Sequence, residues 1–213
     1  MSSVNDSLLN PHLLEMYVGT MYSGKSKALI ERALEAKKRG IPTFIFKPLV
    51  DTRSVDLMSK AGMRVECMNL SRSTDILLDE NLKKETNALV LIDELHFFDG
   101  LIIYVVQYLI HIGHNVVVAC LDRDFRGQPF NDTAYLMVLA DKVTTLYSRC
   151  SIEGCKNPGS LTQRLRNGKP DSLLTKTIEI EFVAEVEYQP VCREHHRIPD
   201  FEDFIRQKVG IEF

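Results

Sequence analysis

Hydrophobic residues follow two different spacings along the first two thirds of the chain. Short apolar runs predict strands at residues 13–19, 43–47, 88–93 and 115–122. The last two runs are continuously apolar, as expected for strands that are buried on both faces of a sheet. Between these runs, apolar residues recur at helical spacing and predict helices over 25–40, 73–85, 100–113 and 131–141. Residues 63–70 could form another strand. Strands that alternate with helices favour an α/β fold, with a mostly parallel sheet flanked by helices on both faces.

The character of the sequence changes after about residue 147. Residues 148–199 contain Cys, Gly, Pro and Asn together with short alternating segments such as TIEIEFVAEVEY, so we expect a small second domain there. Residues 200–213 predict a terminal helix with a short tail, and the polar residues 1–12 predict a flexible N-terminus. Residues 13–147 would then form the α/β domain.

Composition narrows the function classes. A chain of 213 residues is long enough for one sizeable core plus a small satellite domain. The formal net charge of −3 provides no overall field that would attract nucleic acid or an anionic membrane, so we expect neither as a partner. No run of 18 apolar residues occurs, and the N-terminal sequence lacks the pattern of a signal peptide, which makes a cytoplasmic location the default expectation.

A glycine-rich stretch follows the first predicted strand. Residues 19–26 fit the phosphate-loop pattern G-x-x-x-x-G-K-S, and they are Gly19, Thr20, Met21, Tyr22, Ser23, Gly24, Lys25 and Ser26. The pattern has the required context, because a strand precedes it and a helix follows it. Glycines allow backbone N–H groups to surround phosphate oxygens at the positive end of the helix. Lys25 would reach the β- and γ-phosphates of a nucleotide, and the Ser26 hydroxyl would bind Mg²⁺.

Two acidic residues end the predicted strand at 88–93. Asp93 would hold Mg²⁺ beside the phosphate loop. Adjacent residues at a strand end point to opposite sides, so Glu94 could instead face a second substrate and accept the proton of a hydroxyl group. The alternative is a pair of solvated acids that cap the following helix.

Cysteines are distributed unevenly. Cys67 and Cys120 lie singly in apolar runs and are expected in the core. The other three lie in polar, turn-rich sequence and, with one histidine, form two pairs that suit tetrahedral Zn²⁺: Cys150 with Cys155, and Cys192 with His195. His196 is the alternative histidine, but His195 fits the C-x-x-H spacing better. The other readings are free cysteines, or a site with three ligands or no metal.

Six segments together resemble the thymidine kinase family of the small, tetrameric, zinc-containing type that occurs in bacteria, large DNA viruses and animal cytosol. They are GTMYSGKS at 19–26, FKPLVDTR at 46–53, IDELHFFD at 92–99, LDRDFRGQPF at 121–130, LTQR at 161–164 and YQPVCREHH at 188–196. The resemblance extends from about residue 14 to 199. It implies a P-loop, RecA-like ATP-binding domain, a zinc-binding lasso domain and a homotetramer.

The resemblance also implies roles for individual residues. The loop at 19–26 would bind the triphosphate of ATP, Asp51 and Arg53 match the family's D-T-R near the transferred phosphate, and Glu94 matches the catalytic base for the 5′-hydroxyl of thymidine. The thymine ring would be enclosed by Met21, Leu121, Phe125 and Phe130, while Val183 and Tyr188 belong to the lasso loop that closes over the nucleoside. The implied reaction is phosphoryl transfer from ATP to thymidine, with deoxyuridine as a second substrate, in pyrimidine salvage.

Several positions depart from the family pattern. Thr20 and Tyr22 replace a proline and a phenylalanine, His96 replaces a glutamine, and Lys60 replaces a histidine. Val183 and Ala184 occupy a stretch of the lasso that usually contains glycine, and Cys155 lies beyond the usual C-x-x-C position, which is Glu153 here. These changes leave two further hypotheses open: a divergent member that binds nucleotide with little turnover, and a P-loop ATPase stimulated by nucleic acid.

Overall fold

The computed structural model describes residues 12–49, 57–58, 64–179 and 185–210. These residues form two compact units that interleave along the sequence. We call the first the sheet unit; its described part covers residues 12–18, 24–49, 57–58, 64–122 and 129–146. The second, the cysteine unit, contains residues 19–23, 123–128 and the chain from Tyr147 onward. Among the described residues, no helix combines the length and the apolar character needed to cross a membrane.

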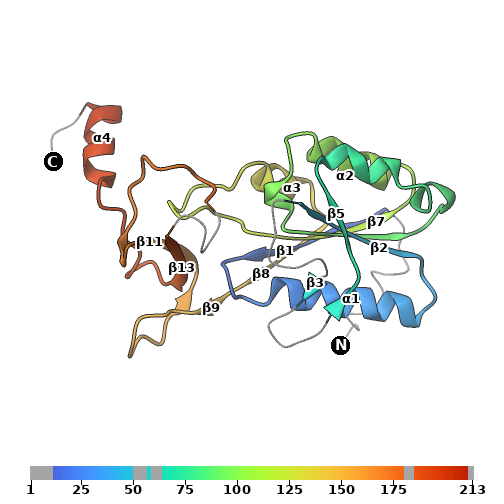
Figure 1. Ribbon diagram of the computed structural model, residues 1–213, viewed down its shortest axis with the longest axis horizontal. Coiled ribbons are helices and arrows are strands. Elements are labelled where there is room, and N and C mark those ends of the chain that lie inside the picture. Colours follow the sequence, from blue (N-terminus) through green and yellow to red (C-terminus); the bar gives the residue numbers. More distant parts are fainter. Residues whose placement is uncertain (1–11, 50–56, 59–63, 180–184, 211–213) are drawn as a thin grey trace. The chain divides into compact units, whose positions relative to one another are not determined.

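A six-stranded sheet forms the centre of the sheet unit within the described residues (Figure 1). Its strand order is β5 (Met68–Leu70), β2 (Thr43–Pro48), β6 (Leu89–Asp93), β7 (Asn115–Cys120), β1 (Leu14–Gly19) and β8 (Lys142–Leu146). The pairs β5/β2, β2/β6, β6/β7 and β7/β1 are all parallel. The prediction of a mostly parallel sheet is therefore confirmed.

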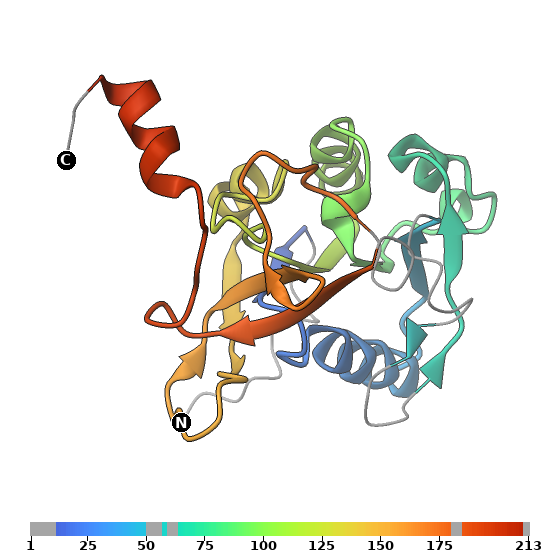
Figure 2. The ribbon, with the colours of Figure 1, turned by 60° about the vertical axis from the view of Figure 1, so that its left-hand side comes forward.

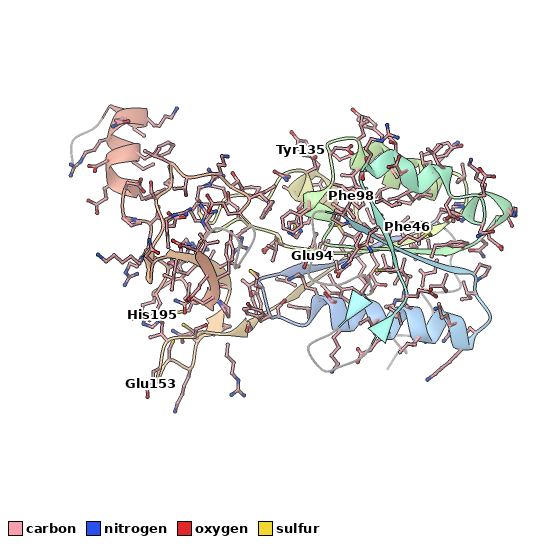
Figure 3. All side chains as sticks on the ribbon, viewed as in Figure 1. Phe46, Glu94, Phe98, Tyr135, Glu153 and His195 are labelled. Atoms are coloured by element: carbon pink, nitrogen blue, oxygen red, sulfur yellow. The ribbon has the colours of Figure 1, made fainter. Side chains whose placement is uncertain are left out.

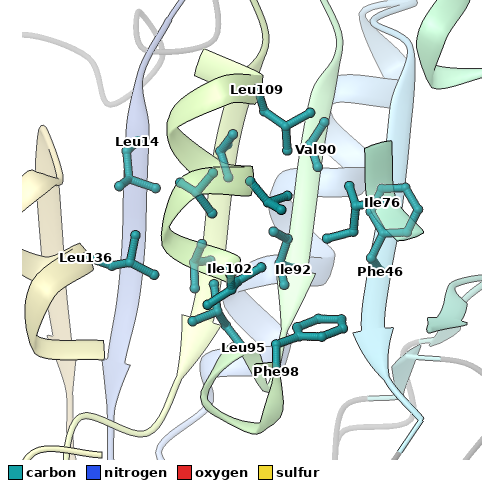
Figure 4. Close-up of a cluster of buried hydrophobic side chains, with 14 of the residues drawn as sticks. Leu14, Phe46, Ile76, Val90, Ile92, Leu95, Phe98, Ile102, Leu109 and Leu136 are labelled. Atoms are coloured by element: carbon teal, nitrogen blue, oxygen red, sulfur yellow. The ribbon is translucent and has the colours of Figure 1, made fainter. Parts of the chain in front are cut away.

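Helices cover both faces of this sheet because alternate strand residues point to opposite sides. Leu91 of β6 packs in one cluster with Leu29 and Ile30 of α1 (Lys25–Lys38). Its neighbours Val90 and Ile92 face the other side. There they join α2 (Ile102–His111) and α3 (Thr133–Leu139) in a second cluster, which Figure 4 shows in close-up.

One local prediction was wrong, and another was confirmed only in part. The helix expected at 73–85 is a pair of short 3₁₀ helices, η2 (Ser73–Leu78) and η3 (Leu82–Lys84). Asp79 separates them because its backbone is extended and its carboxylate accepts hydrogen bonds from the N–H groups of Asn81 and Leu82, at 3.1 and 2.7 Å. The strand considered at 63–70 is divided, since β4 (Arg64–Val65) pairs with β3 (Leu57–Met58), whereas β5 joins the central sheet.

The cysteine unit is built on antiparallel strands (Figure 2). β11 (Leu161–Arg166) pairs with β12 (Lys169–Pro170) and with β13 (Val186–Val191), and Arg164 lies opposite Tyr188 in the register. A second pair consists of β9 (Ser148–Arg149) and β10 (Pro158–Gly159). The chain then forms α4 (Phe201–Val209), which agrees with the helix predicted at the C-terminal end.

Candidate active site and cysteine–histidine cluster

The phosphate-loop sequence lies between the end of β1 and the start of α1, in the strand–loop–helix context that the motif requires. Gly19 and Gly24 have φ angles of 139° and 94°, which glycine adopts without the strain that a side chain would bring. The Ser23 hydroxyl oxygen is buried and has no hydrogen-bond partner among the described residues. A phosphate oxygen at the N-terminus of α1 would supply such a partner, so the loop fits the triphosphate of a nucleotide.

Lys25 is the first residue of α1, and its side chain is buried. Burial lowers the pKa of its ammonium group, and the nearby carboxylates of Glu94 and Asp93 oppose this shift. A buried ammonium group gains from any further negative charge beside it. The environment of Lys25 therefore favours an anionic ligand.

Ser26 and Asp93 come together although 67 residues separate them. The Ser26 hydroxyl lies 3.1 Å from Oδ2 and 3.4 Å from Oδ1 of the Asp93 carboxylate. A hydroxyl and a carboxylate are the oxygen ligands that Mg²⁺ prefers next to nucleotide phosphates. The two residues fit the magnesium role that the sequence predicts for them.

Glu94, labelled in Figure 3, follows Asp93. Its backbone is strained, with φ 49° and ψ 38°. This left-handed turn ends β6 and leads into η4 (Leu95–Phe97). The Glu94 Oε2 atom lies 3.4 Å from Nε2 of His96. A left-handed conformation is costly for a residue with a side chain, and such strain is concentrated at functional sites.

His96 is completely buried and contacts Leu121 and Phe130, two of the predicted nucleoside-binding residues. Its Nδ1 atom accepts a hydrogen bond from the backbone N–H of Leu121 at 3.2 Å, and its ring lies edge-on to the ring of Phe130 at 4.5 Å. Asn131 also donates a hydrogen bond to its carbonyl at 2.7 Å. The sequence showed His96 only as a departure from the family, so its contact with Glu94 was missed.

The cysteine unit holds the predicted residues Met21, Phe125 and Tyr188. The Phe125 ring is buried, and the guanidinium carbon of Arg164 lies 3.5 Å from its centroid. The Tyr188 hydroxyl donates to the carbonyl of Glu179 at 2.8 Å. Arg164 was not predicted as a site residue, although it ends the LTQR segment. The predicted residues Asp51, Arg53 and Val183, like Lys60 and Ala184, lie outside the described residues.

Three cysteines and one histidine form a compact cluster in the cysteine unit. The ligand atoms of Cys150, Cys155, Cys192 and His195 all lie within 4.8 Å of one another. The Sγ atoms of Cys155 and Cys192 are 3.9 Å apart, and His195 Nδ1 lies 3.6 Å from Cys150 Sγ. Tetrahedral Zn²⁺ with ordinary bond lengths requires separations of about 3.8 Å between two sulfurs and about 3.5 Å between sulfur and nitrogen. The cluster therefore fits zinc.

The protonation equilibria of this cluster also suit a metal. Burial opposes ionisation of Cys192, but hydrogen bonds from the backbone and the ring of His195 outweigh it and lower the thiol pKa to about 6. Thiolate is the form of cysteine that binds metal. His196 points elsewhere, since its Nε2 atom lies 2.8 Å from the carbonyl oxygen of Phe125. Glu153 is exposed and does not belong to the cluster (Figure 3).

The parallel sheet, the phosphate loop after β1 and the acidic end of β6 define a P-loop nucleotide-binding fold with an added cysteine–histidine cluster. The family model described as "Thymidine kinase" matches residues 12–196. The chain therefore belongs to the thymidine kinase family, whose members are kinases that use ATP to phosphorylate a nucleoside.

The fold is also similar to solved structures of the genome packaging NTPase B204 from Sulfolobus turreted icosahedral virus 2. The complex with AMPPCP has 16% identity and a TM-score of 0.42, and the match covers 67% of this chain and 78% of that chain. The complex with ATP-gammaS has 15% identity and a TM-score of 0.43, with coverage of 65% and 76%. Similarity at this level carries no argument about function.

Proposed function

We propose that the protein is a thymidine kinase that transfers the γ-phosphate of ATP to the 5′-hydroxyl of thymidine, and also of deoxyuridine, in pyrimidine salvage. Membership in the family supports the reaction class. The observation that carries the assignment of the ATP site is the pairing of Ser26 with Asp93 beside the buried Lys25. The products would be thymidine 5′-phosphate and ADP.

In this proposal the loop at 19–26 binds the triphosphate, and Lys25 contacts the β- and γ-phosphates. Glu94 accepts the proton of the 5′-hydroxyl as that oxygen bonds to the γ-phosphorus, and the bond to the bridging oxygen of ADP breaks. When bound, Mg²⁺ neutralises charge on the phosphates, and Ser26 and Asp93 would hold it. Asp51 and Arg53, which lie outside the described residues, keep their proposed roles near the transferred phosphate.

We further propose that thymine is enclosed by apolar and aromatic side chains: Met21, Leu121, Phe125 and Phe130, with Val183 and Tyr188 from the lasso. Flat apolar surfaces suit a pyrimidine ring. The burial of Phe125 and of Phe130 supports this assignment, because both are anchored by neighbouring polar groups rather than exposed to solvent.

Structural zinc, a homotetramer and a cytoplasmic location complete the proposal. The cysteine–histidine cluster supplies four protein ligands and leaves no open position for substrate, which supports a structural metal. Four exposed apolar side chains on α2 and α3 support association: Tyr104, Tyr108, Tyr135 and Val138. The cytoplasmic location follows from the usual location of the family.

Phosphate transfer from radiolabelled ATP to thymidine or deoxyuridine tests the function directly. Labelled nucleoside monophosphate is the expected product. Tight nucleoside binding without product would favour a binding protein, and ATP hydrolysis stimulated by nucleic acid would favour the ATPase. Glu94→Gln should lower kcat by about two or more orders of magnitude while ATP binding is kept. An unchanged kcat would exclude Glu94 as the base.

A further inference from the structure

Arg164 is the largest side chain among the completely buried residues of the described chain. Burial of a guanidinium group is costly unless its charge and its N–H donors are matched by partners. Its Nε atom lies 2.8 Å from Oδ2 of Asp171, and one terminal nitrogen donates to the carbonyl of Lys176 at 2.7 Å. The other terminal nitrogen donates to the hydroxyl of Thr175. Arg164 on β11 therefore binds three residues of the 171–179 segment, namely Asp171, Thr175 and Lys176.

The same guanidinium group also contacts two residues of the proposed nucleoside site. It lies against the ring of Phe125, with 3.5 Å between the guanidinium carbon and the ring centroid. This is a cation–π contact within a buried environment, where such contacts are strongest. One terminal nitrogen also lies 3.5 Å from the hydroxyl oxygen of Tyr188, which itself donates to Glu179. A single side chain thus joins Phe125, Tyr188 and the 171–179 segment.

The two arginines keep the carboxyl group of Asp171 ionised. Burial opposes the ionisation of Asp171, but hydrogen bonds from Arg166 and the charge of Arg164 outweigh it and hold the pKa of the carboxyl below its ordinary value. Both arginines therefore face a carboxylate at neutral pH.

Arg166 provides an internal comparison. It lies two residues further along β11, on the same face of the strand, and it also binds Asp171, at 3.0 Å. It is partly exposed and pairs with Glu179, which lies in the 171–179 segment. Its described hydrogen bonds go to the carboxylates of Asp171 and Glu179, whereas Arg164 lies against the Phe125 ring. The two arginines thus share a segment, and the cation–π contact with Phe125 at 3.5 Å belongs to Arg164.

From these contacts we infer that Arg164 is a positioning residue for nucleoside binding, which fixes the Phe125 ring and the Tyr188 hydroxyl in the orientation that receives the base. This inference rests on the proposed function, since it takes Phe125 and Tyr188 as nucleoside contacts. Lysine cannot replace arginine here, because an ammonium group lacks the flat face that stacks on the ring and the fork of donors that reaches several acceptors.

The test measures KM for thymidine, KM for ATP and kcat in Arg164→Lys, Arg164→Met and the control Arg166→Met. Both Arg164 variants should raise KM for thymidine about tenfold or more and leave KM for ATP within about twofold. Arg166→Met should change KM for thymidine by less than about threefold, since Arg164 keeps its own pair with Asp171 and its contact with Phe125. A merely structural role would instead raise both KM values together, or would affect the Arg164 and Arg166 variants equally.

The melting temperature of Arg164→Lys and the calorimetric affinity for thymidine allow the inference to be tested even if Arg164→Met does not fold. If Arg164→Met does not fold, Arg164→Lys with a melting temperature close to that of the parent protein carries the test, and calorimetry of thymidine binding without ATP replaces the KM. Unchanged thymidine affinity in a folded Arg164 variant would overturn the inference while the parent enzyme remains active. Failure of the parent protein to phosphorylate any nucleoside would instead overturn the proposed function.

Discussion

His96 Nε2 lies 3.4 Å from the Glu94 carboxylate, while His96 Nδ1 accepts a hydrogen bond from the backbone N–H of Leu121. Because a backbone N–H can only donate, Nδ1 of the neutral ring carries no proton and Nε2 carries it. The protonated nitrogen is thus the ring atom that lies 3.4 Å from the proposed catalytic base, although this contact does not have hydrogen-bond geometry. This contact is well suited to orient the carboxylate of Glu94, whose own backbone is strained.

Substitution of His96 should therefore affect catalysis more than binding. His96→Leu removes the donor and should lower kcat by about 10- to 100-fold, because a small displacement of a catalytic group is costly. His96→Gln keeps an N–H donor and should retain kcat within about threefold. Steady-state kinetics with matched melting temperatures would check this. Equal kcat values for the parent protein and His96→Leu would show that Glu94 needs no support from this ring.

Gly24 and Gly40 form a matched pair for testing the phosphate loop. Both have positive φ, at 94° and 70°, and an added Cβ would meet no atom within 4 Å at either position. Alanine should therefore cost roughly 1–2 kcal/mol at each site through backbone strain alone. Both variants should lose a similar amount of thermal stability, but only Gly24→Ala should raise KM for ATP. A normal KM for ATP in Gly24→Ala would contradict the role of this turn in phosphate binding.

The parts of the fold that sequence could predict are those in which local pattern and tertiary environment agree. β6 and β7 are apolar on both faces because the sheet is covered on both sides, so their runs identify them directly. β8 was not predicted because its exposed positions carry no continuous apolar run. The helix predicted at 73–85 failed because the side chain of Asp79 competes for backbone N–H groups, which hydrophobic spacing does not register.

The same distinction applies to the site. The phosphate loop is a local motif, so its residues could be named from their spacing. The residues that contact Glu94 and Phe125 could not be named in this way, because their contacts form only in the folded chain. The His96 ring is oriented by the N–H of Leu121, and the Arg164 guanidinium group lies against the Phe125 ring. Cys155 is an intermediate case, since its spacing is unusual but its sulfur lies with the other ligand atoms.

Zinc content tests the cysteine–histidine cluster. The purified protein should contain about one zinc ion per chain, as four-ligand sites do. Cys155→Ser should reduce the zinc content and the melting temperature, because a small unit gains much of its stability from such a metal. Cys67→Ser is the control, since Cys67 lies outside the cluster. Full zinc content in Cys155→Ser would indicate a site with only three protein ligands.

The proposed tetramer can be tested by substitution of the exposed apolar side chains on α2 and α3. Val138 is 86% exposed and Tyr135 is 68% exposed, and both lie on α3. Light scattering should give about four times the chain mass of 24.3 kDa, as expected for a closed symmetric assembly. Val138→Asp should lower that mass, whereas Leu174→Asp, a similarly exposed position in the cysteine unit, should not. A monomeric parent protein would exclude the tetramer.

The buried carboxylate of Glu15 should make the free energy of unfolding depend on pH. It is buried in β1 and pairs with Arg32 at 2.7 Å and with Lys142 at 2.8 Å. Burial opposes its ionisation, but the hydrogen bond from Lys142 and the charge of Arg32 outweigh it and lower its pKa below the ordinary value of 4.5. The carboxylate therefore stabilises the folded protein above pH 4.5, and this contribution disappears as the pH falls through the lowered pKa.

Glu15→Gln should accordingly lower the free energy of unfolding by roughly 3 kcal/mol at neutral pH, because it removes the negative charge that two cations face. The difference from the parent protein should shrink as the pH is lowered below 4.5, where the carboxylate of the parent protein begins to lose its advantage. Glu31→Gln is the control, since its pair with Lys27 is exposed and should contribute little at any pH. Denaturant unfolding at a series of pH values measures both variants. A gap between Glu15→Gln and the parent protein that stays constant from neutral to strongly acidic pH would mean that Glu15 stabilises the fold through packing rather than through its charge.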